Sequence, residues 1–167
     1  MIWLTLKHYQ MPKKPESKLW KALRDGTAGL GVHWVRMESW ASPGVPDVNG
    51  CLNGNDFWVE LKVLTTKSDK KFPKWRPHQI VWQTSRTRVG GCVWNLVHHP
   101  SSSCLLFLDG THLAQRLMDG DPVYDDRMDW PIDKDGWAEV LRRLTKSDDE
   151  RRRETRAEII RRQSVTS

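Results

Sequence analysis

The sequence has few of the features that would place the chain in a membrane or among disulfide-stabilised proteins. Of its 167 residues, no apolar run approaches the roughly 20 residues needed to cross a bilayer. Its cysteines, Cys51, Cys92 and Cys104, are odd in number and lie inside predicted strands, which favours buried thiols over disulfides or a zinc site. His98-His99 has no cysteine at ligand spacing, so we assign it to a strand end, with metal binding as the alternative.

The sequence also lacks a secretory signal peptide and internal repeats. Residues 1–7 have no basic region ahead of their apolar residues and no small-residue cleavage site. We therefore expect a cytoplasmic protein. No internal repeat and no extended low-complexity region is visible, and the length fits one domain.

Acidic residues are outnumbered by basic ones. Lysine and arginine total 27 against 21 aspartates and glutamates, giving a formal charge of +6 and a pI near 9.4. A basic balance of this size suits a polyanionic partner, although it says nothing about the fold.

Residues 45–63 carry the most informative pattern. A residue before proline is pushed to extended backbone, so Val45-Pro46 makes Asp47 open a strand. Asn53-Gly54 is typical of a tight turn, and residues 57–63 are rich in strand formers. The two runs predict a β-hairpin.

Side chains alternate along the second strand of this hairpin. Trp58, Glu60 and Lys62 share one face, while the apolar residues between them face a core. Glu60 can then meet Asp47 across the hairpin, and two carboxylates with a main-chain carbonyl between them suit Mg²⁺ or Mn²⁺. The alternative for Glu60 and Lys62 is a solvated strand face.

Such a group of residues suits the hydrolysis of a phosphodiester. A carboxylate-held metal ion offsets charge on the phosphoryl oxygens and lowers the pKa of a bound water. The Lys62 ammonium would stand beside that water and orient it or help to deprotonate it. The pattern therefore indicates a divalent-metal nuclease site.

Pro46-Asp47 followed by Glu60-Leu61-Lys62 resembles the signature of the PD-(D/E)xK nucleases. The longer match is to the VRR-NUC branch and to phage and archaeal Holliday junction resolvases, and it covers about residues 14–98. This likeness depends on an ordered set, which is Glu16, Gly44 to Asp47, Glu60 to Lys62, and Gln79.

The resemblance implies a role for each matching residue. Asp47, Glu60 and the Leu61 carbonyl would bind Mg²⁺ or Mn²⁺, Lys62 would serve the attacking water, and Gln79 would hold Lys62 or the scissile phosphate. The third carboxylate stays open between two residues. Glu16 also suits a helix start for dipole reasons alone, and Glu38 could simply pair with Arg36.

A basic segment follows this motif directly. Between residues 67 and 88, seven basic residues stand against Asp69 alone. We expect a flap that grips phosphates on either side of the cut, with a solvated loop and helix face as the alternative. The residues are Lys67, Lys70, Lys71, Lys74, Arg76, Arg86 and Arg88.

Ten tryptophans are many for this length, and most should be core residues. Trp40 and Trp75 differ, because each stands in a loop next to the predicted site. Their rings could stack on unpaired bases or, alternatively, cap the core beneath the loops.

The expected fold class is α/β, with a restriction-endonuclease-like αβββαβ core, a mixed central sheet flanked by helices, and a helical C-terminal extension. We expect a nuclease core over residues 1–120, then a turn-rich segment and extension with a partly flexible tail over 121–167. The elements expected are helices at 16–24, 78–89, 113–118 and 133–145, and strands at 32–39, 47–51, 58–63, 92–97 and 103–108.

The functional expectation is a Mg²⁺- or Mn²⁺-dependent endodeoxyribonuclease acting on branched DNA such as Holliday junctions. The resemblance also implies a homodimer, because symmetrical branched substrates need two paired cuts. A small basic nuclease would suit phage recombination, which would place it in the host cytoplasm. The alternatives are a nuclease for flaps, nicks or other DNA, and an inactive DNA-binding module that keeps the fold.

Overall fold

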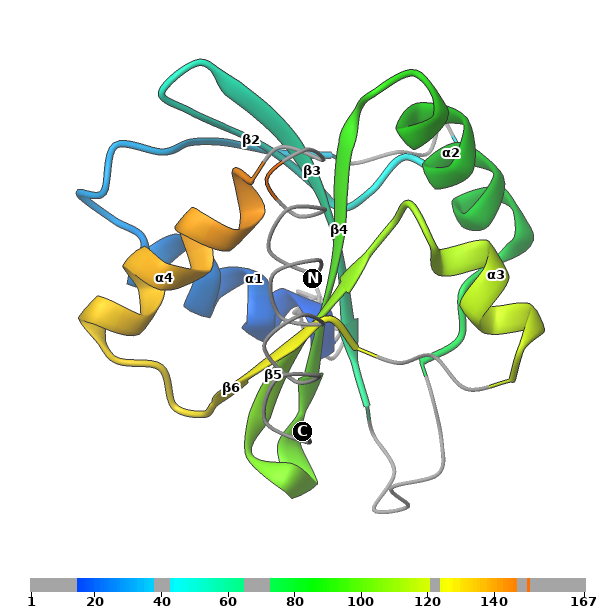
Figure 1. Cartoon of the computed structure of the whole chain (residues 1–167). Coiled ribbons are helices and arrows are strands. Elements are labelled where there is room, and N and C mark those ends of the chain that lie inside the picture. The colour runs from blue at the N-terminus through cyan, green and yellow to red at the C-terminus, as the bar shows by residue number, and fades with distance from the viewer. Residues whose placement is uncertain (1–14, 38–42, 65–72, 121–123, 147–149, 151–167) are drawn as a thin grey trace, which may run out of the picture.

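The computed structural model describes residues 15–37, 43–64, 73–120, 124–146 and 150. A six-stranded sheet runs through the molecule with helices on both faces, as Figure 1 shows. In chain order the elements are α1 (Pro15–Gly26), β1 (His33–Arg36), β2 (Val48–Leu52), β3 (Asn55–Val63), α2 (Pro77–Arg88), β4 (Cys92–His99), β5 (Cys104–Asp109), α3 (Leu113–Met118), β6 (Asp126–Asp129) and α4 (Lys134–Leu144).

The strands lie in sequence order across the sheet, and β3 and β4 form its one parallel pair among the described residues. The other neighbours are antiparallel. Helix α2 makes the crossover that a parallel pair requires. The predicted αβββαβ order and mixed α/β fold class are therefore confirmed.

The hairpin of β2 and β3 is closed by the predicted turn. Asn53 and Gly54 have positive φ values of 51° and 79°, and Leu52 pairs with Asn55 directly across them. A two-residue turn with both φ values positive matches the twist of the strands it joins. The turn fixes the register, which pairs Val48 with Val59 and so brings Asp47 level with Glu60.

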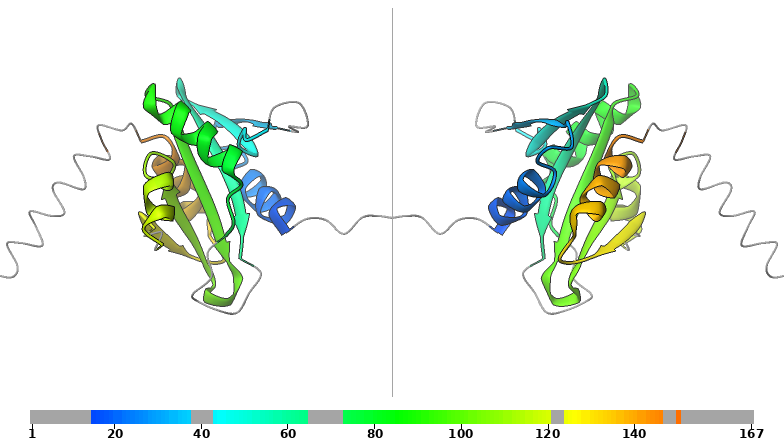
Figure 2. Two further views of the ribbon diagram at one scale, coloured as in Figure 1. Left: turned by 90° about the vertical axis from the view of Figure 1, so that its right-hand side faces the viewer. Right: turned by 90° about the vertical axis from the view of Figure 1, so that its left-hand side faces the viewer.

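Two apolar clusters hold the helices on the sheet. Helices α1 and α4 bury Leu23 and Val140 against one face of β3 and β4. Helix α3 and the residues before α2 cover the other face, where Leu113 and Trp75 are buried. Figure 2 shows α2 and α3 over one face and α1 and α4 over the other.

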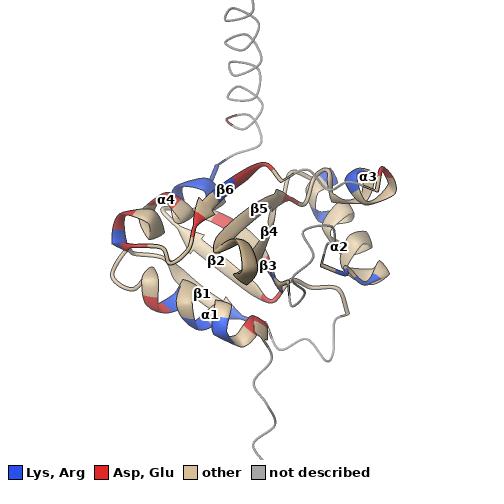
Figure 3. Cartoon of the chain, turned by 90° about the horizontal axis from the view of Figure 1, so that it is seen from below, with Lys and Arg blue, Asp and Glu red and all other residues tan. Residues whose placement is uncertain are grey.

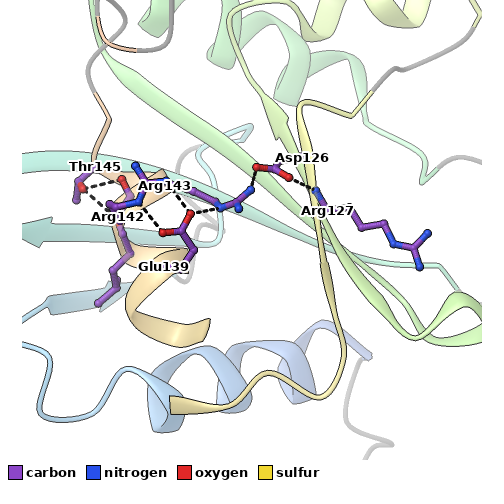
Figure 4. A network of polar contacts seen from close by, with 7 residues as sticks. Asp126, Arg127, Glu139, Arg142, Arg143 and Thr145 are labelled. Atoms are coloured by element: carbon purple, nitrogen blue, oxygen red, sulfur yellow. Dashed lines mark hydrogen bonds and ion pairs between the residues drawn. The ribbon is translucent and has the colours of Figure 1, made fainter. Parts of the chain in front are cut away.

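Strand β6 is not among the predicted elements. Its sequence, Asp126 to Asp129, is polar and was assigned to a turn-rich segment, yet it pairs along the edge of β5. Arg143 of α4 joins Asp126 of this strand to Glu139, as Figure 4 shows. The described residues after 120 thus belong to the same sheet and core, and the division expected at residue 120 does not separate two packing units there.

Other boundaries differ by a few residues. Strand β1 ends at Arg36, and residues 38 and 39 of the predicted strand lie outside the described residues. Asp133 is the N-cap of α4, its carboxylate accepting a hydrogen bond from the Gly136 N–H at 2.7 Å. Cys104 is buried as predicted, whereas Cys51 and Cys92 are partly exposed. Cys51 lies next to the Asn53-Gly54 turn, at the closed end of the hairpin.

Charged residues of both signs occur along α1 and α4, as Figure 3 shows. Examples are the ion pairs of Lys21 with Asp25 and of Arg142 with Glu139. Within the described part of the chain, no helix is both long and apolar enough to pass through a lipid bilayer.

Candidate active site

A cavity of about 770 Å³ opens beside Asp47, at the end of the loop that leads into the β2–β3 hairpin. The start of α1, the end of β1 and the start of α2 surround it. It brings together three carboxylates and three cationic side chains. These are Glu16, Asp47 and Glu60, and Arg36, Lys62 and Arg76.

Asp47 is fixed by its backbone and by its side chain. The Met37 N–H donates to its main-chain carbonyl at 2.8 Å, and the Leu61 N–H donates to its carboxylate Oδ2 at 2.9 Å. Gly44 precedes it with φ +95°, and a Cβ there would collide with the carbonyl oxygen of His78. The glycine therefore lets the loop that carries Asp47 lie directly against the first turn of α2.

The Leu61 main chain faces the same side as this carboxylate. Its N–H donates to Asp47, and the N–H and carbonyl of one strand residue point the same way. Strand β2 begins only at Val48, which pairs with Val59, so no β2 residue stands opposite Leu61. The Leu61 carbonyl thus adds a third oxygen beside the two carboxylates.

Glu60 is buried beneath α2, with 2% of its surface exposed. Its Oε1 lies 2.8 Å from the Lys62 ammonium and accepts a hydrogen bond from Gln79 Nε2 at 2.5 Å. Its Oε2 is buried and has no hydrogen-bond partner among the described residues. The alternative of a solvated strand face is wrong for this residue, because α2 covers this face of β3.

Gln79 links the other groups of the site. Its Oε1 accepts from the Lys62 ammonium at 3.1 Å and from the Arg76 N–H at 3.0 Å, at the first turn of α2. The Lys62 side chain is 14% exposed, so the helix start largely covers it. Gln79 thus forms hydrogen bonds with both Lys62 and Glu60.

Burial and crowding alter the acidity of the two carboxylates. Burial, followed by the charge of Asp47, raises the pKa of Glu60 to about 7, and Lys62 opposes the rise. Burial also raises the pKa of Asp47, which the Leu61 N–H and Lys62 partly offset. Perturbed carboxylates that share a cavity are typical of functional sites.

The donor set fits a hard divalent cation. Asp47, Glu60 and the Leu61 carbonyl offer oxygen ligands, and a carboxylate oxygen of Glu60 without a hydrogen-bond partner among the described residues lies buried there. Across the described ranges, no group of three or more His, Cys, Asp or Glu side chains lies close enough to hold a metal ion. Mg²⁺ is commonly bound through one or two carboxylates and several waters, so a site for it would depend on Asp47, Glu60 and the Leu61 carbonyl.

The two candidates for the third carboxylate fare differently. Glu16 lies in the first turn of α1 and lines the cavity, and its charge helps to raise the pKa of Asp47. Glu38 lies outside the described residues. Glu16 therefore shares the cavity with Asp47 and Glu60, although among the described residues the three carboxylates form no group that could hold a metal ion.

Of the seven residues of the basic segment, Arg76 is the one that the described structure places in the cavity. Lys67, Lys70 and Lys71 lie outside the described residues, and Lys74 is exposed. Arg76 lines the cavity, whereas Arg86 and Arg88 stand in the last turn of α2, at the far end of the helix. Arg86 lies 3.9 Å from Asp56 and over the ring of Trp58.

Trp75 is a core residue and not a surface ring. It is 8% exposed, packs in the cluster beneath α3, and donates from its ring N–H to Asn95 Oδ1 at 2.8 Å. The base-stacking role expected for Trp75 is corrected on this ground, and the alternative of a core residue holds. Trp40 lies outside the described residues.

Sequence reasoning missed four residues near the site. Arg36 and His78 line the cavity. Gln83 and Asn95 are wholly buried behind it. Asn95 did leave a signal, because it is the lone polar residue within the apolar run of β4.

No protein-family model matches the chain, and no curated protein sequence matches it. Solved structures do match, among them that of Hjc from Archaeoglobus fulgidus, a Holliday junction resolvase. That likeness has a TM-score of 0.38 and 18% sequence identity, and it covers 68% of this chain and 81% of the other. Likeness this distant carries no argument about function, which depends here on the geometry of the cavity.

Proposed function

We propose that the chain is a divalent-metal-dependent endonuclease that hydrolyses phosphodiester bonds of DNA. One observation carries the proposal: Asp47, Glu60, Lys62 and Gln79 converge in one cavity, and Glu60 keeps a buried oxygen without a partner among the described residues. A buried carboxylate oxygen without a partner is costly to a fold unless a cation or proton joins it.

The metal ligands would be Asp47, Glu60 and the Leu61 carbonyl, with Glu16 as the third carboxylate. A bound Mg²⁺ or Mn²⁺ would polarise the phosphoryl group and lower the pKa of a bound water. A donor set of two carboxylates and a main-chain carbonyl supports this choice of metal.

Lys62 would act on the attacking water. Its ammonium is held between Glu60 Oε1 and Gln79 Oε1, so its remaining proton can face the cavity. In that place it orients the water and offsets charge as the phosphoryl group is attacked. Gln79 accepts from Lys62 with one atom and donates to Glu60 with the other, which fixes the distance between the two.

Arg36 and Arg76 would bind phosphates on either side of the cut. They enter the cavity from β1 and from the start of α2, and within the described ranges neither has an ion pair. Among the described residues, the Arg36 guanidinium donates one hydrogen bond, to Ser17 Oγ at 3.5 Å. Unpaired guanidinium groups are suited to phosphate oxygens. Lys67, Lys70, Lys71, Lys74, Arg86 and Arg88 would extend the contact with the strand.

The substrate we propose is branched DNA such as a four-way junction, cut by a homodimer. This part rests on the resemblance of the ordered motif, since no feature of the described residues selects a branched geometry. Flaps and nicked duplexes are the other DNA structures to compare.

The test offers the purified full chain labelled four-way junctions, flaps, nicked duplex and single strands with Mg²⁺ or Mn²⁺. We expect cuts on both strands of the junction, mapped at nucleotide resolution. Glu60→Gln should bind the junction and give no product. Asp129→Asn is the matched control, since that carboxylate is 92% exposed on the edge strand β6.

Each result decides between the candidates. Cutting confined to flaps or nicks would replace the branched substrate. Salt-sensitive binding without any metal-dependent cleavage would identify an inactive DNA-binding module. Normal turnover by Glu60→Gln would remove the site assignment itself.

A further inference from the structure

Helix α2 forms hydrogen bonds with the sheet through two glutamines one turn apart. Gln79 donates to Glu60 Oε1, and Gln83 donates to Asn95 Oδ1 at 2.9 Å. Glu60 and Asn95 are directly paired in the parallel register of β3 and β4. Residues four apart on a helix lie on the same face, so the two glutamines meet two neighbouring strand residues as successive rungs.

The second rung is fully satisfied. Asn95 Oδ1 accepts from Gln83 and from the Trp75 ring N–H, and Asn95 Nδ2 donates to Gln83 Oε1 at 2.9 Å and to the Leu108 carbonyl at 3.1 Å. These four hydrogen bonds use every donor and acceptor site that the amide offers. Gln83 and Asn95 are both 0% exposed.

Stability alone does not account for this arrangement. Replacing both partners of a buried hydrogen-bonded pair by apolar groups of similar shape is often nearly neutral, so two leucines could fill the same space. What the amide pair adds is a defined position, because its hydrogen bonds are satisfied at only one rotation and one height of α2.

The network also reaches the residue before the helix. Trp75 anchors the chain to Asn95, and the N–H of the next residue, Arg76, donates to Gln79 Oε1. Gln79 is therefore fixed from both sides, by Gln83 one turn later and by Trp75 and Arg76 just before it.

We infer that Gln83 and Asn95 are positioning residues: through α2 they set the place of Gln79 against Lys62 and Glu60. The inference deepens the proposed function and rests on it for its kinetic consequence. The geometric part concerns the metal-free protein and stands independently of catalysis.

The direct test observes the side-chain amide of Gln79 by NMR in the full-length, metal-free protein. The signal is assigned by its loss in Gln79→Leu. In the wild type the amide should be shifted and exchange slowly with solvent, since one N–H is bonded to the buried Glu60. In Gln83→Leu it should move to the position and exchange rate of a free glutamine.

The kinetic test compares cleavage by the same variants. We expect Gln83→Leu to lower kcat at least tenfold with KM for DNA changed less than threefold. The length-swapped double variant, Gln83→Asn with Asn95→Gln, keeps an amide on each side and should recover most of kcat. Val140→Ala on α4 is the matched control, a cavity in the opposite core that lowers stability without touching α2.

The results separate the two proposals. An unchanged Gln79 signal in Gln83→Leu would overturn the positioning role, whatever the activity. An equal fall of kcat in Val140→Ala would also overturn it, because general destabilisation would then explain the loss. A wild type that cuts no DNA would remove the proposed function, while the NMR comparison would still decide on the positioning.

Discussion

The cluster beneath α1 and α4 is formed by apolar side chains, with Thr27 as a buried polar neighbour that accepts a hydrogen bond from Trp34. The opposite face of the same sheet buries Glu60 and Asn95 against Gln79 and Gln83 of α2. Leu23 and Val140 on one face and Gln83 and Asn95 on the other are all 0% exposed, so exposure does not explain the difference. The buried polar side chains lie at or directly behind the cavity, whereas α1 reaches the cavity only with its first turn, through Glu16 and Ser17. We infer that one face stabilises the fold and the other holds the candidate site in place.

The sharpest way to break this comparison is Lys62→Ala on the polar face. Loss of an ammonium that offsets developing charge typically slows a reaction by about 10²–10³. We expect that loss in single-turnover cleavage of a four-way junction, with binding of the same junction little changed. Lys21→Ala, which removes an exposed lysine of α1, is the control.

A full rate for Lys62→Ala would show that the buried ammonium serves only the stability of Glu60. The polar face would then have no demonstrated role in catalysis.

The complementary change is Leu23→Ala on the apolar face. Leu23 is 0% exposed in α1, and a leucine-to-alanine change in a core costs about 2–5 kcal/mol. We expect the free energy of unfolding in urea to fall by that amount. The cleavage rate per folded molecule should stay nearly the same, because Leu23 does not line the cavity and lies about two helical turns from Glu16.

A loss of rate in folded Leu23→Ala, measured well below its melting temperature, would mean that the two faces are not independent.

Glu60→Gln sharpens the comparison through pH. Because burial raises the pKa of Glu60 to about 7, the folded metal-free protein binds more protons than the unfolded chain between about pH 4.5 and 7. Its stability therefore falls as pH rises through this range, by on the order of 3 kcal/mol for a shift of this size. The glutamine variant lacks this titration.

We thus expect the free energies of unfolding of variant and wild type to diverge in favour of the variant from pH 5 to pH 8. Adding Mg²⁺ at pH 8 should stabilise the wild type and leave Glu60→Gln unchanged. Parallel pH profiles for the two proteins, measured by urea unfolding, would contradict the buried environment described for Glu60.

The sequence reveals those residues of the site that lie close together along the chain. Asp47, Glu60 and Lys62 belong to one hairpin whose register is set by the Asn53-Gly54 turn, so local rules were enough to bring them together. Gln79 was found through the ordered motif.

The Gln83–Asn95 pair could not be found in the same way. It depends on the parallel register of β3 and β4 across a helical crossover, which no local pattern specifies. Trp75 was undecidable for the same reason, because its burial depends on a residue twenty positions away.

Strand β6 is an element that the local sequence predicts wrongly. Its polar residues have low strand propensity, and it forms because the edge of β5 offers unpaired main-chain groups and Arg143 binds Asp126 from α4. Tertiary context overrides local preference here, and the turn-rich composition was therefore misleading.

The smallest expected effect concerns the cap of α4 on the apolar face. Asp133 Oδ1 accepts from the Gly136 N–H, and an alanine at an N-cap costs about 1 kcal/mol. Asp133→Ala should lower the free energy of unfolding by that amount, whereas Asp133→Asn should preserve it, since asparagine caps as well as aspartate. Neither should change cleavage. A rate change without a stability change would mean that α4 acts on the site by a route other than the apolar core.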